Sequence, residues 1–236
     1  MSARICSRCA WSSSWVHGPS PARSLYPAIC PVTASQRDRG AGLHDLTWAR
    51  FNDAEPLIGL GRLAEAGRLL RECQQVFEDH RDTPALATVL STRASLEDVS
   101  GLAGAAADLE RTAIRYRYAR PEPRDIAISH HNLANYLWEV GEGRAGQRAH
   151  RLAAALIYQL TGMTHDLADA HRELAAEIRA DPGAGLPATL GDVIQVAERT
   201  DGVRLGDLIA DLQPDPQAAA AALIEILRAA ASPPAG

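Results

Sequence analysis

Three glycines that lie forty residues apart constrain the fold of this chain more than any other feature of its sequence. They are Gly61, Gly101 and Gly141. Small residues keep the same spacing before and after each glycine: Ala54, Ala94 and Ala134, then Cys73, Ala113 and Ala153. A period shared by several columns indicates duplication of one supersecondary unit, and units of this length bury their apolar faces by stacking on one another. The sequence therefore predicts an array of helical repeats in the middle of the chain.

The composition also favours closely packed helices. Hydrophobic residues make up 46% of the 236 residues, but many of them are Ala, and aromatic residues are only 5%. Alanine is a strong helix former that buries little area. All 24 basic residues are Arg, so a Schiff-base lysine, a P-loop lysine and a lysine general base are excluded. After residue 45, 19 Arg stand against 27 acidic residues, which disfavours binding to nucleic acid through its phosphates.

Residues 1–45 differ from the rest of the chain. They are rich in Ser, Pro, Arg and Gly, show no apolar period, and contain no acidic residue before Asp38, so we expect this segment to be disordered. Pro19 interrupts the apolar stretch that a secretory signal would need. A transit peptide, a misassigned start and a fragment of a larger protein stay open. No stretch approaches the roughly 18 apolar residues of a membrane span, and we expect a cytoplasmic protein with no membrane partner.

The cysteines offer one candidate metal site. Cys6 and Cys9 form a C-x-x-C pair, and His17 and Cys30 would complete four zinc ligands. Zinc sites normally need a closely spaced second pair, which His17 and Cys30 do not form. We therefore expect inert thiols and no metal or cofactor, with a zinc- or thiol-dependent protein as the alternative. Cys73 falls in a column otherwise filled by Ala, so it is predicted to be a small core residue.

Each repeat is predicted to consist of two helices joined at the glycine, which would end the first helix in a left-handed conformation. Units are expected near 46–83, 84–124 and 125–162. Their first helices are predicted over 46–60, 84–100 and 125–140. The second helices are predicted over 63–80, after the turn at Gly101 to about residue 119, and after the turn at Gly141 through residue 160. Pro84, Pro121 and Pro123 fall between units, where helices must stop, whereas Pro56 should kink the first helix.

A different pattern follows the third unit. One more amphipathic helix is predicted over 164–179, which ends the array at about residue 180. Residues 181–236 are predicted to form a capping subdomain with helices over 189–198, 204–212 and 216–231. Thr189 and Asp192 have the spacing of a capping box, and Asp215-Pro216 is typical of a helix start. Solenoids need an end that covers their last apolar face, although an independent binding module is an alternative.

The repeat region resembles the tetratricopeptide repeat family. Residues 60–66, Leu-Gly-Arg-Leu-Ala-Glu-Ala, match its L-G-x-x-x-E-A pattern, and residues 132–137, Asn-Leu-Ala-Asn-Tyr-Leu, are similar to the first helix of the longer kinesin-light-chain-like repeats. The resemblance covers residues 46 to about 162. It departs from the family pattern at Gly146 and Ala105. It implies an all-α fold, a right-handed solenoid of three helical hairpins, here followed by the C-terminal cap.

The resemblance also implies a concave groove lined by the first helices. The family's groove positions fall on these residues: Trp48, Phe51, Glu55 and Ile58; Thr88, Ser91, Ser95 and Asp98; Ile128, His131, Asn135 and Trp138. Their aromatic rings could anchor a partner's side chains, and Asn135 could bond a peptide backbone. This predicts a non-catalytic adaptor for a protein or peptide. Alternatively, Trp48 and Phe51 are core residues, or the array associates with itself. No Arg occupies these columns, so a clamp for a C-terminal carboxylate is not expected.

Two further patterns look like chemistry. Gly141, Gly143 and Gly146 match G-x-G-x-x-G, but a helix is predicted before them, whereas dinucleotide binding requires a strand there. Adjacent histidines such as His130 and His131 point about 100° apart on a helix and cannot share a metal readily. His150, His165 and His171 add no helical metal-binding pair. No nucleophile stands beside a base, so the sequence predicts no enzyme.

Overall fold

The computed structural model describes residues 42–141, 144–181, 189–201, 203–212 and 215–231. Every regular element within these residues is an α-helix. The predicted all-α fold class is therefore confirmed. The helices are α2 (Leu43–Phe51), α3 (Ala54–Gly59), α4 (Leu63–Asp79), α5 (Thr83–Val99), α6 (Ala103–Ala119), α7 (Pro123–Val140), α8 (Arg144–Leu160), α9 (Thr164–Ala180), α10 (Leu190–Asp201), α11 (Leu205–Leu212) and α12 (Pro216–Ala231).

The repeated glycines adopt the left-handed conformation that their spacing predicted. The backbone φ angles are 72° at Gly61, 82° at Gly101 and 75° at Gly141, and Gly162 adopts 73° after α8. A residue with a Cβ atom is disfavoured at such angles, whereas glycine is not, so glycine ends a helix and reverses the chain at little cost. These glycines therefore set where α3, α5, α7 and α8 end.

The prediction of one continuous first helix over 46–60 is wrong. The chain forms α2 and α3 instead, separated by a turn at Asn52 and Asp53. Proline has no N–H, and in a continuous helix the Pro56 ring would clash with the carbonyl of Asn52, four residues earlier. The break places Pro56 in the first turn of α3, where no helical hydrogen bond from its nitrogen is needed. Helix α2 also begins at Leu43, earlier than predicted.

The remaining helices start and stop close to the predicted residues. Thr189 and Asp192 form the predicted capping box, in which Asp192 N donates to Thr189 Oγ1 at 3.2 Å and Thr189 N donates to Asp192 Oδ2 at 2.9 Å. Asp215 Oδ1 accepts from Ala218 N at 2.9 Å, next to Pro216 at the start of α12. Local capping chemistry thus explains where α10 and α12 begin.

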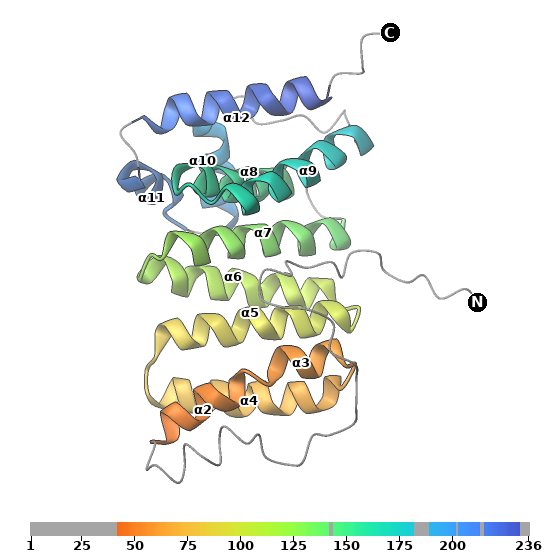
Figure 1. The fold of residues 1–236 in the computed structure, drawn as a ribbon, viewed down its shortest axis with the longest axis vertical. Helices are drawn as coiled ribbons and strands as arrows, with labels where there is room; N and C mark the ends of the chain where they lie inside the picture. The colour runs from red at the N-terminus through yellow and green to blue at the C-terminus, as the bar shows by residue number, and fades with distance from the viewer. Residues whose placement is uncertain (1–41, 142–143, 182–188, 202, 213–214, 232–236) are drawn as a thin grey trace, which may run out of the picture.

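The helices pack mainly on their neighbours in the chain. Helices α5 and α6 lie against each other, as do α7 and α8. Contacts between α6 and α7 join these two pairs, and α4 packs on α5 and α9 on α8. Figure 1 shows the resulting stack, which runs from α2 at one end to α12 at the other. Helices α10, α11 and α12 contact α8, and α12 also contacts α9, so the C-terminal segment covers that end of the stack. No helix in the described ranges is long and apolar enough to cross a membrane.

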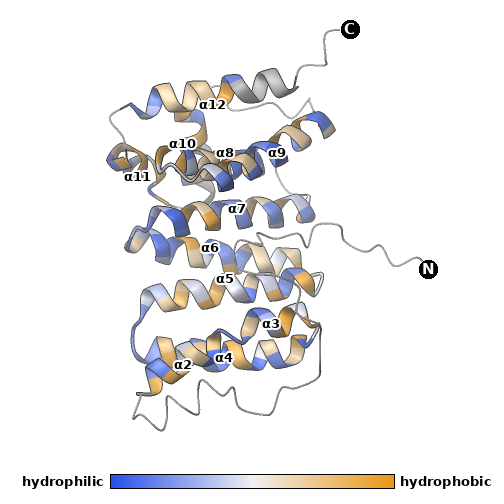
Figure 2. Cartoon of the chain, viewed as in Figure 1, coloured by the Kyte–Doolittle hydropathy of each residue, from blue (hydrophilic) through white to orange (hydrophobic). Residues whose placement is uncertain are grey.

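Among the residues that the structure describes, buried apolar side chains form three separate clusters. The first joins α4 and α5 around Leu70, Phe77 and Val89. The second is small and rich in Ala, and it lies between α5, α6 and α7 around Ala94, Ala107 and Leu133. The third and largest runs from α7 and α8 into α9 and the C-terminal helices. Along most helices hydrophobic and hydrophilic residues are interspersed (Figure 2), as expected when each helix keeps one side toward its neighbours.

Polar clusters between the helices as a candidate functional site

The predicted groove residues of the second and third units lie on two neighbouring helices. Ser91 and Ser95 belong to α5, whereas His131, Asn135 and Trp138 belong to α7. Ser91 is buried and the other four are partly buried. Helices α5 and α7 meet through hydrogen bonds between positions close to these: Asn132 Nδ2 donates to Ser91 Oγ at 3.4 Å, and the hydroxyls of Ser95 and Tyr136 are 3.4 Å apart. The structure therefore brings these five predicted residues onto adjacent elements.

The predicted groove residues of the first unit are arranged differently. The ring of Trp48 lies 5.6 Å from that of Phe51 and 5.0 Å from that of Phe77, measured between centroids. Trp48 and Phe51 pack against the first apolar cluster and are partly buried there, while Glu55 is exposed on α3. The two aromatic side chains thus contribute to the core at this end of the stack.

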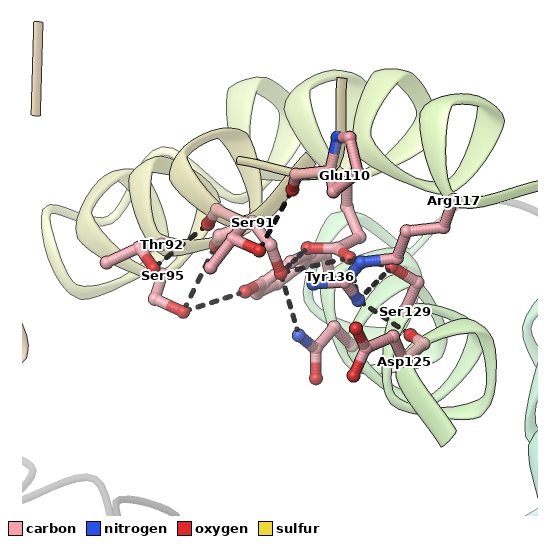
Figure 3. Close-up of polar contacts among 11 residues, drawn as sticks. Ser91, Thr92, Ser95, Glu110, Arg117, Asp125, Ser129 and Tyr136 are labelled. Carbon is pink, nitrogen blue, oxygen red and sulfur yellow. Dashed lines mark hydrogen bonds and ion pairs between the residues drawn. The ribbon is translucent and has the colours of Figure 1, made fainter. Parts of the chain in front are cut away.

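A buried carboxylate joins α5, α6 and α7. We call Ser91, Glu110, Arg117, Ser129 and Asn132 the Glu110 cluster. Glu110 is fully buried, and it accepts hydrogen bonds from Ser129 Oγ at 2.6 Å and from Ser91 Oγ at 2.9 Å. Arg117 Nη1 donates to Ser129 Oγ at 2.6 Å and lies 4.0 Å from Glu110 Oε1. Figure 3 shows the side chains of Ser91, Glu110, Arg117 and Ser129 converging between the helices.

Burial raises the pKa of Glu110, and the nearby Arg117 and the donors Ser129, Ser91 and Asn132 oppose that rise. Both carboxylate oxygens accept hydrogen bonds, and the side chain has no access to solvent. A group enclosed in this way cannot reach a substrate. The Glu110 cluster therefore connects three helices through a buried, hydrogen-bonded carboxylate.

A second cluster joins α7, α8 and α9 and includes two predicted groove residues. We call His131, Asn135, Arg151, Glu173 and Glu177 the Arg151 cluster. Arg151 Nη2 donates to Asn135 Oδ1 at 2.6 Å and to Glu177 Oε1 at 2.8 Å, and its Nη1 lies 2.8 Å from Glu173 Oε2. Arg151 Nη1 is also 3.1 Å from His131 Nδ1. Sequence reasoning missed this arginine at the groove positions, because it considered side chains of the first helices alone.

The sequence does contain a signal for Arg151. Arg71, Arg111 and Arg151 repeat at the same forty-residue spacing as the glycines. No arginine occupies the predicted groove positions on the first helices. Arg151 nevertheless contacts two of the groove residues, His131 and Asn135, from α8. Because its guanidinium has only donors, it orients the Asn135 amide with the oxygen toward Arg151 and the nitrogen away from it.

Histidines form a third polar contact, between α7 and α8. The Nδ1 atoms of His130 and His150 are 2.8 Å apart, and His130 Nε2 lies 2.8 Å from the Tyr118 hydroxyl. His131 points instead toward Arg151 and Glu173, as expected for adjacent residues on a helix. No group of three or more His, Cys, Asp or Glu side chains within the described ranges is arranged to hold a metal ion.

The remaining candidates do not form a reactive site among the described residues. Cys73 is buried in the first apolar cluster, as predicted, and burial raises the pKa of its thiol to about 11, so the reactive thiolate is disfavoured. A helix precedes Gly141, as predicted, and not the strand that dinucleotide binding requires. Cys6, Cys9, His17 and Cys30 lie outside the described residues. Models of known protein families and curated proteins yield no match to this chain.

Proposed function

We propose that this protein is a non-catalytic adaptor that binds a peptide or protein segment along α5 and α7, and that its helices form a right-handed solenoid of tetratricopeptide-like hairpins capped by α10–α12. The support for the hairpins is their regularity. Glycines at the same spacing end successive first helices in the same left-handed conformation, and each helix packs on its neighbours in the chain.

One observation carries the binding proposal. On α5 and α7, the side chains at two equivalent positions of successive units stay partly exposed although the two helices are in contact: Ser95 and Asp98 on α5, and Asn135 and Trp138 on α7. An aromatic ring beside hydrogen-bonding groups is typical of protein interaction surfaces. Arg151 holds the Asn135 amide so that its nitrogen is turned away, in the orientation that suits donation to a backbone carbonyl.

The enclosed polar clusters support a non-catalytic role. The buried charged groups Glu110 and Arg151 bond Ser91 of α5 and Asn135 of α7, and each is also bonded to further neighbours. These contacts fix the relative positions of α5 to α9. Because the binding face is already ordered, the protein loses less conformational entropy when a segment binds.

A photo-crosslinking experiment tests the proposal. A photoreactive aromatic amino acid is placed at Trp138 or, as the matched control, at Tyr116, an exposed aromatic position on α6. We expect the photoreactive residue at position 138 to crosslink a defined partner in cell extract, and the one at position 116 not to. The purified partner should bind Trp138→Ala and Asn135→Ala at least tenfold more weakly than it binds the wild type and Tyr116→Ala. A partner that crosslinks equally to both positions, or binds all variants equally, contradicts the proposal. Circular dichroism of each variant controls for folding.

A further inference from the structure

The interface between α7 and α8 concentrates basic side chains in the interior of the protein. His130 and His150 are both 0% exposed, while Arg148 and Arg151 are 1% and 2% exposed. His131 lies beside Arg151. Histidine is the side chain whose ordinary pKa places its change of charge near neutral pH, so the number of positive charges in this interface depends on pH.

The geometry of the His130–His150 pair limits how many protons it accepts. The two Nδ1 atoms face each other at 2.8 Å, and the rings are stacked with centroids 5.1 Å apart. At that distance one nitrogen donates a hydrogen and the other accepts it. If both rings were fully protonated, both nitrogens would carry a hydrogen, and the two would collide. The pair therefore keeps this contact only while at least one ring is neutral.

The neighbouring helices offer little compensation for added positive charge at His130. From α6, the Tyr118 hydroxyl faces His130 Nε2, and from α8 the ring of His150 faces its Nδ1. These two groups are the contacts of His130 in the part of the chain that the structure describes, and neither is a carboxylate.

The charged groups elsewhere in the interface already serve other cations. From α9, Glu173 and Glu177 each lie 2.8 Å from the Arg151 guanidinium. Arg148 donates to the carbonyl oxygens of Glu177 and Asp181 at the C-terminal end of α9. Burial and the neighbouring His150 keep the pKa of His130 well below its ordinary value, and burial and Arg151 lower that of His131 to about 3.

We propose that the α7–α8 interface is an acid-sensitive junction, in which mild acidification adds a proton that the His130–His150 contact cannot hold and shifts the protein toward a form with α8 separated from α7, while the packing of α4 on α5 persists. Well above the ordinary histidine pKa of about 6.5, closed and open forms carry the same protons, and pH has no effect through these groups. Below it, the open form takes up protons that the closed form excludes. The ratio of closed to open molecules then falls about tenfold per pH unit for each excluded proton.

Hydrogen exchange measured by mass spectrometry tests this junction in the full-length protein. Exchange is compared at about pH 7 and about pH 5, with labelling times corrected for the intrinsic pH dependence of amide exchange. We expect protection of peptides from α7 and α8 to fall at least tenfold more than that of peptides from α4 and α5. The double variant His130→Gln with His150→Gln carries neutral amides at both positions. On a logarithmic scale, its α7 and α8 peptides should lose less than half as much protection between the two pH values as the wild-type peptides do.

The control variant is His165→Gln, because His165 lies on α9 with its side chain 78% exposed. It should behave like the wild type. Raised pKa values at Glu110 and Asp98 act in the opposite direction, since a retained proton favours the folded state at low pH, but both residues are present in every variant and their effect cancels in the comparison.

A titration of the wild-type protein makes the proposal testable even if the double variant does not fold. The imidazole carbon resonances of His130 and His150 are followed by NMR together with the backbone amides of α7 and α8. We expect the two rings to become fully protonated only as those amides shift. The proposal is overturned if both rings protonate near pH 6.5 with the amide signals unchanged, or if protection of α7 and α8 falls no more than that of α4 and α5.

Discussion

Arg151 and Glu177 form an ion pair inside the protein, with Arg151 Nη2 2.8 Å from Glu177 Oε1 and the two residues 2% and 4% exposed. The pair links α8 to α9. A charge at such a depth is strongly disfavoured unless it is paired, so removing Arg151 alone leaves Glu177 buried without its cation, whereas removing Glu177 alone leaves Arg151 with Glu173. The cost of breaking the pair should therefore exceed the cost of removing both charges together.

We expect Arg151→Met to lower the free energy of unfolding by about 3–5 kcal/mol, because Glu177 stays buried without its cation. Arg151→Met combined with Glu177→Leu should lower it by less than the sum of the two single substitutions. Urea denaturation of the wild type, both single variants and the double variant measures the coupling. Strictly additive losses would show that the two residues do not stabilise each other.

Gly101→Ala should lower the free energy of unfolding by about 1–2 kcal/mol, because φ of 82° is disfavoured for any residue with a Cβ atom. Gly104→Ala is the matched control, three residues away in the first turn of α6. A Cβ atom there meets no atom within 4 Å, so Ala should be neutral or stabilise the helix. Thermal denaturation compares the two. Equal effects would argue against the left-handed turn as the source of the constraint.

Ser129→Ala removes a donor to Glu110 and an acceptor for Arg117. We expect it to lower the free energy of unfolding by about 1.5–3 kcal/mol, the range for hydrogen bonds to charged groups. Ser100→Ala, at an exposed position after α5, should change it by less than about 0.5 kcal/mol. Chemical denaturation measures both free energies of unfolding. If Ser129→Ala lowers the free energy of unfolding no more than Ser100→Ala does, the Glu110 cluster does not stabilise the fold.

Cys73 should resist alkylation in the folded protein, because it is 1% exposed and its thiol pKa is raised to about 11. Iodoacetamide at about pH 8, followed by peptide mass spectrometry, should modify the Cys73 peptide at least tenfold more slowly in buffer than in concentrated urea. Cys73→Ala should fold normally, since Ala113 and Ala153 occupy the same column. Equal rates with and without urea would mean that the first apolar cluster opens readily.

The sequence predicts the helical scaffold well wherever one residue decides the local geometry. Gly61, Gly101 and Gly141 set their turns because the left-handed backbone conformation favours glycine. Thr189 and Asp192 set the start of α10 through side-chain hydrogen bonds to nearby backbone groups. Pro56 predicts that the first helix is interrupted, but it does not predict where. A proline shows that a continuous helix would be strained without showing at which residues the chain turns to relieve that strain.

The site is less predictable, because its contacts join residues that the repeat period does not relate. Arg151 and Glu177 lie 26 positions apart, and Glu110 lies 19 positions from both Ser91 and Ser129. Periodicity identifies which residues occupy equivalent places in successive units, but not which side chains of a second helix reach the first helix of the same unit or of the next. The position of Arg151 beside Asn135 required the three-dimensional structure.

The apolar interior is divided between the two ends of the stack. Between them lies the small, alanine-rich cluster around Ala94, Ala107 and Leu133, next to the hydrogen bonds of Glu110. Small side chains and polar contacts bind neighbouring helices through short-range forces and leave little shared apolar surface between distant ones. Substitutions in the apolar cluster at one end should therefore have little effect on the packing of the apolar cluster at the other end, and their effects on stability should be nearly additive.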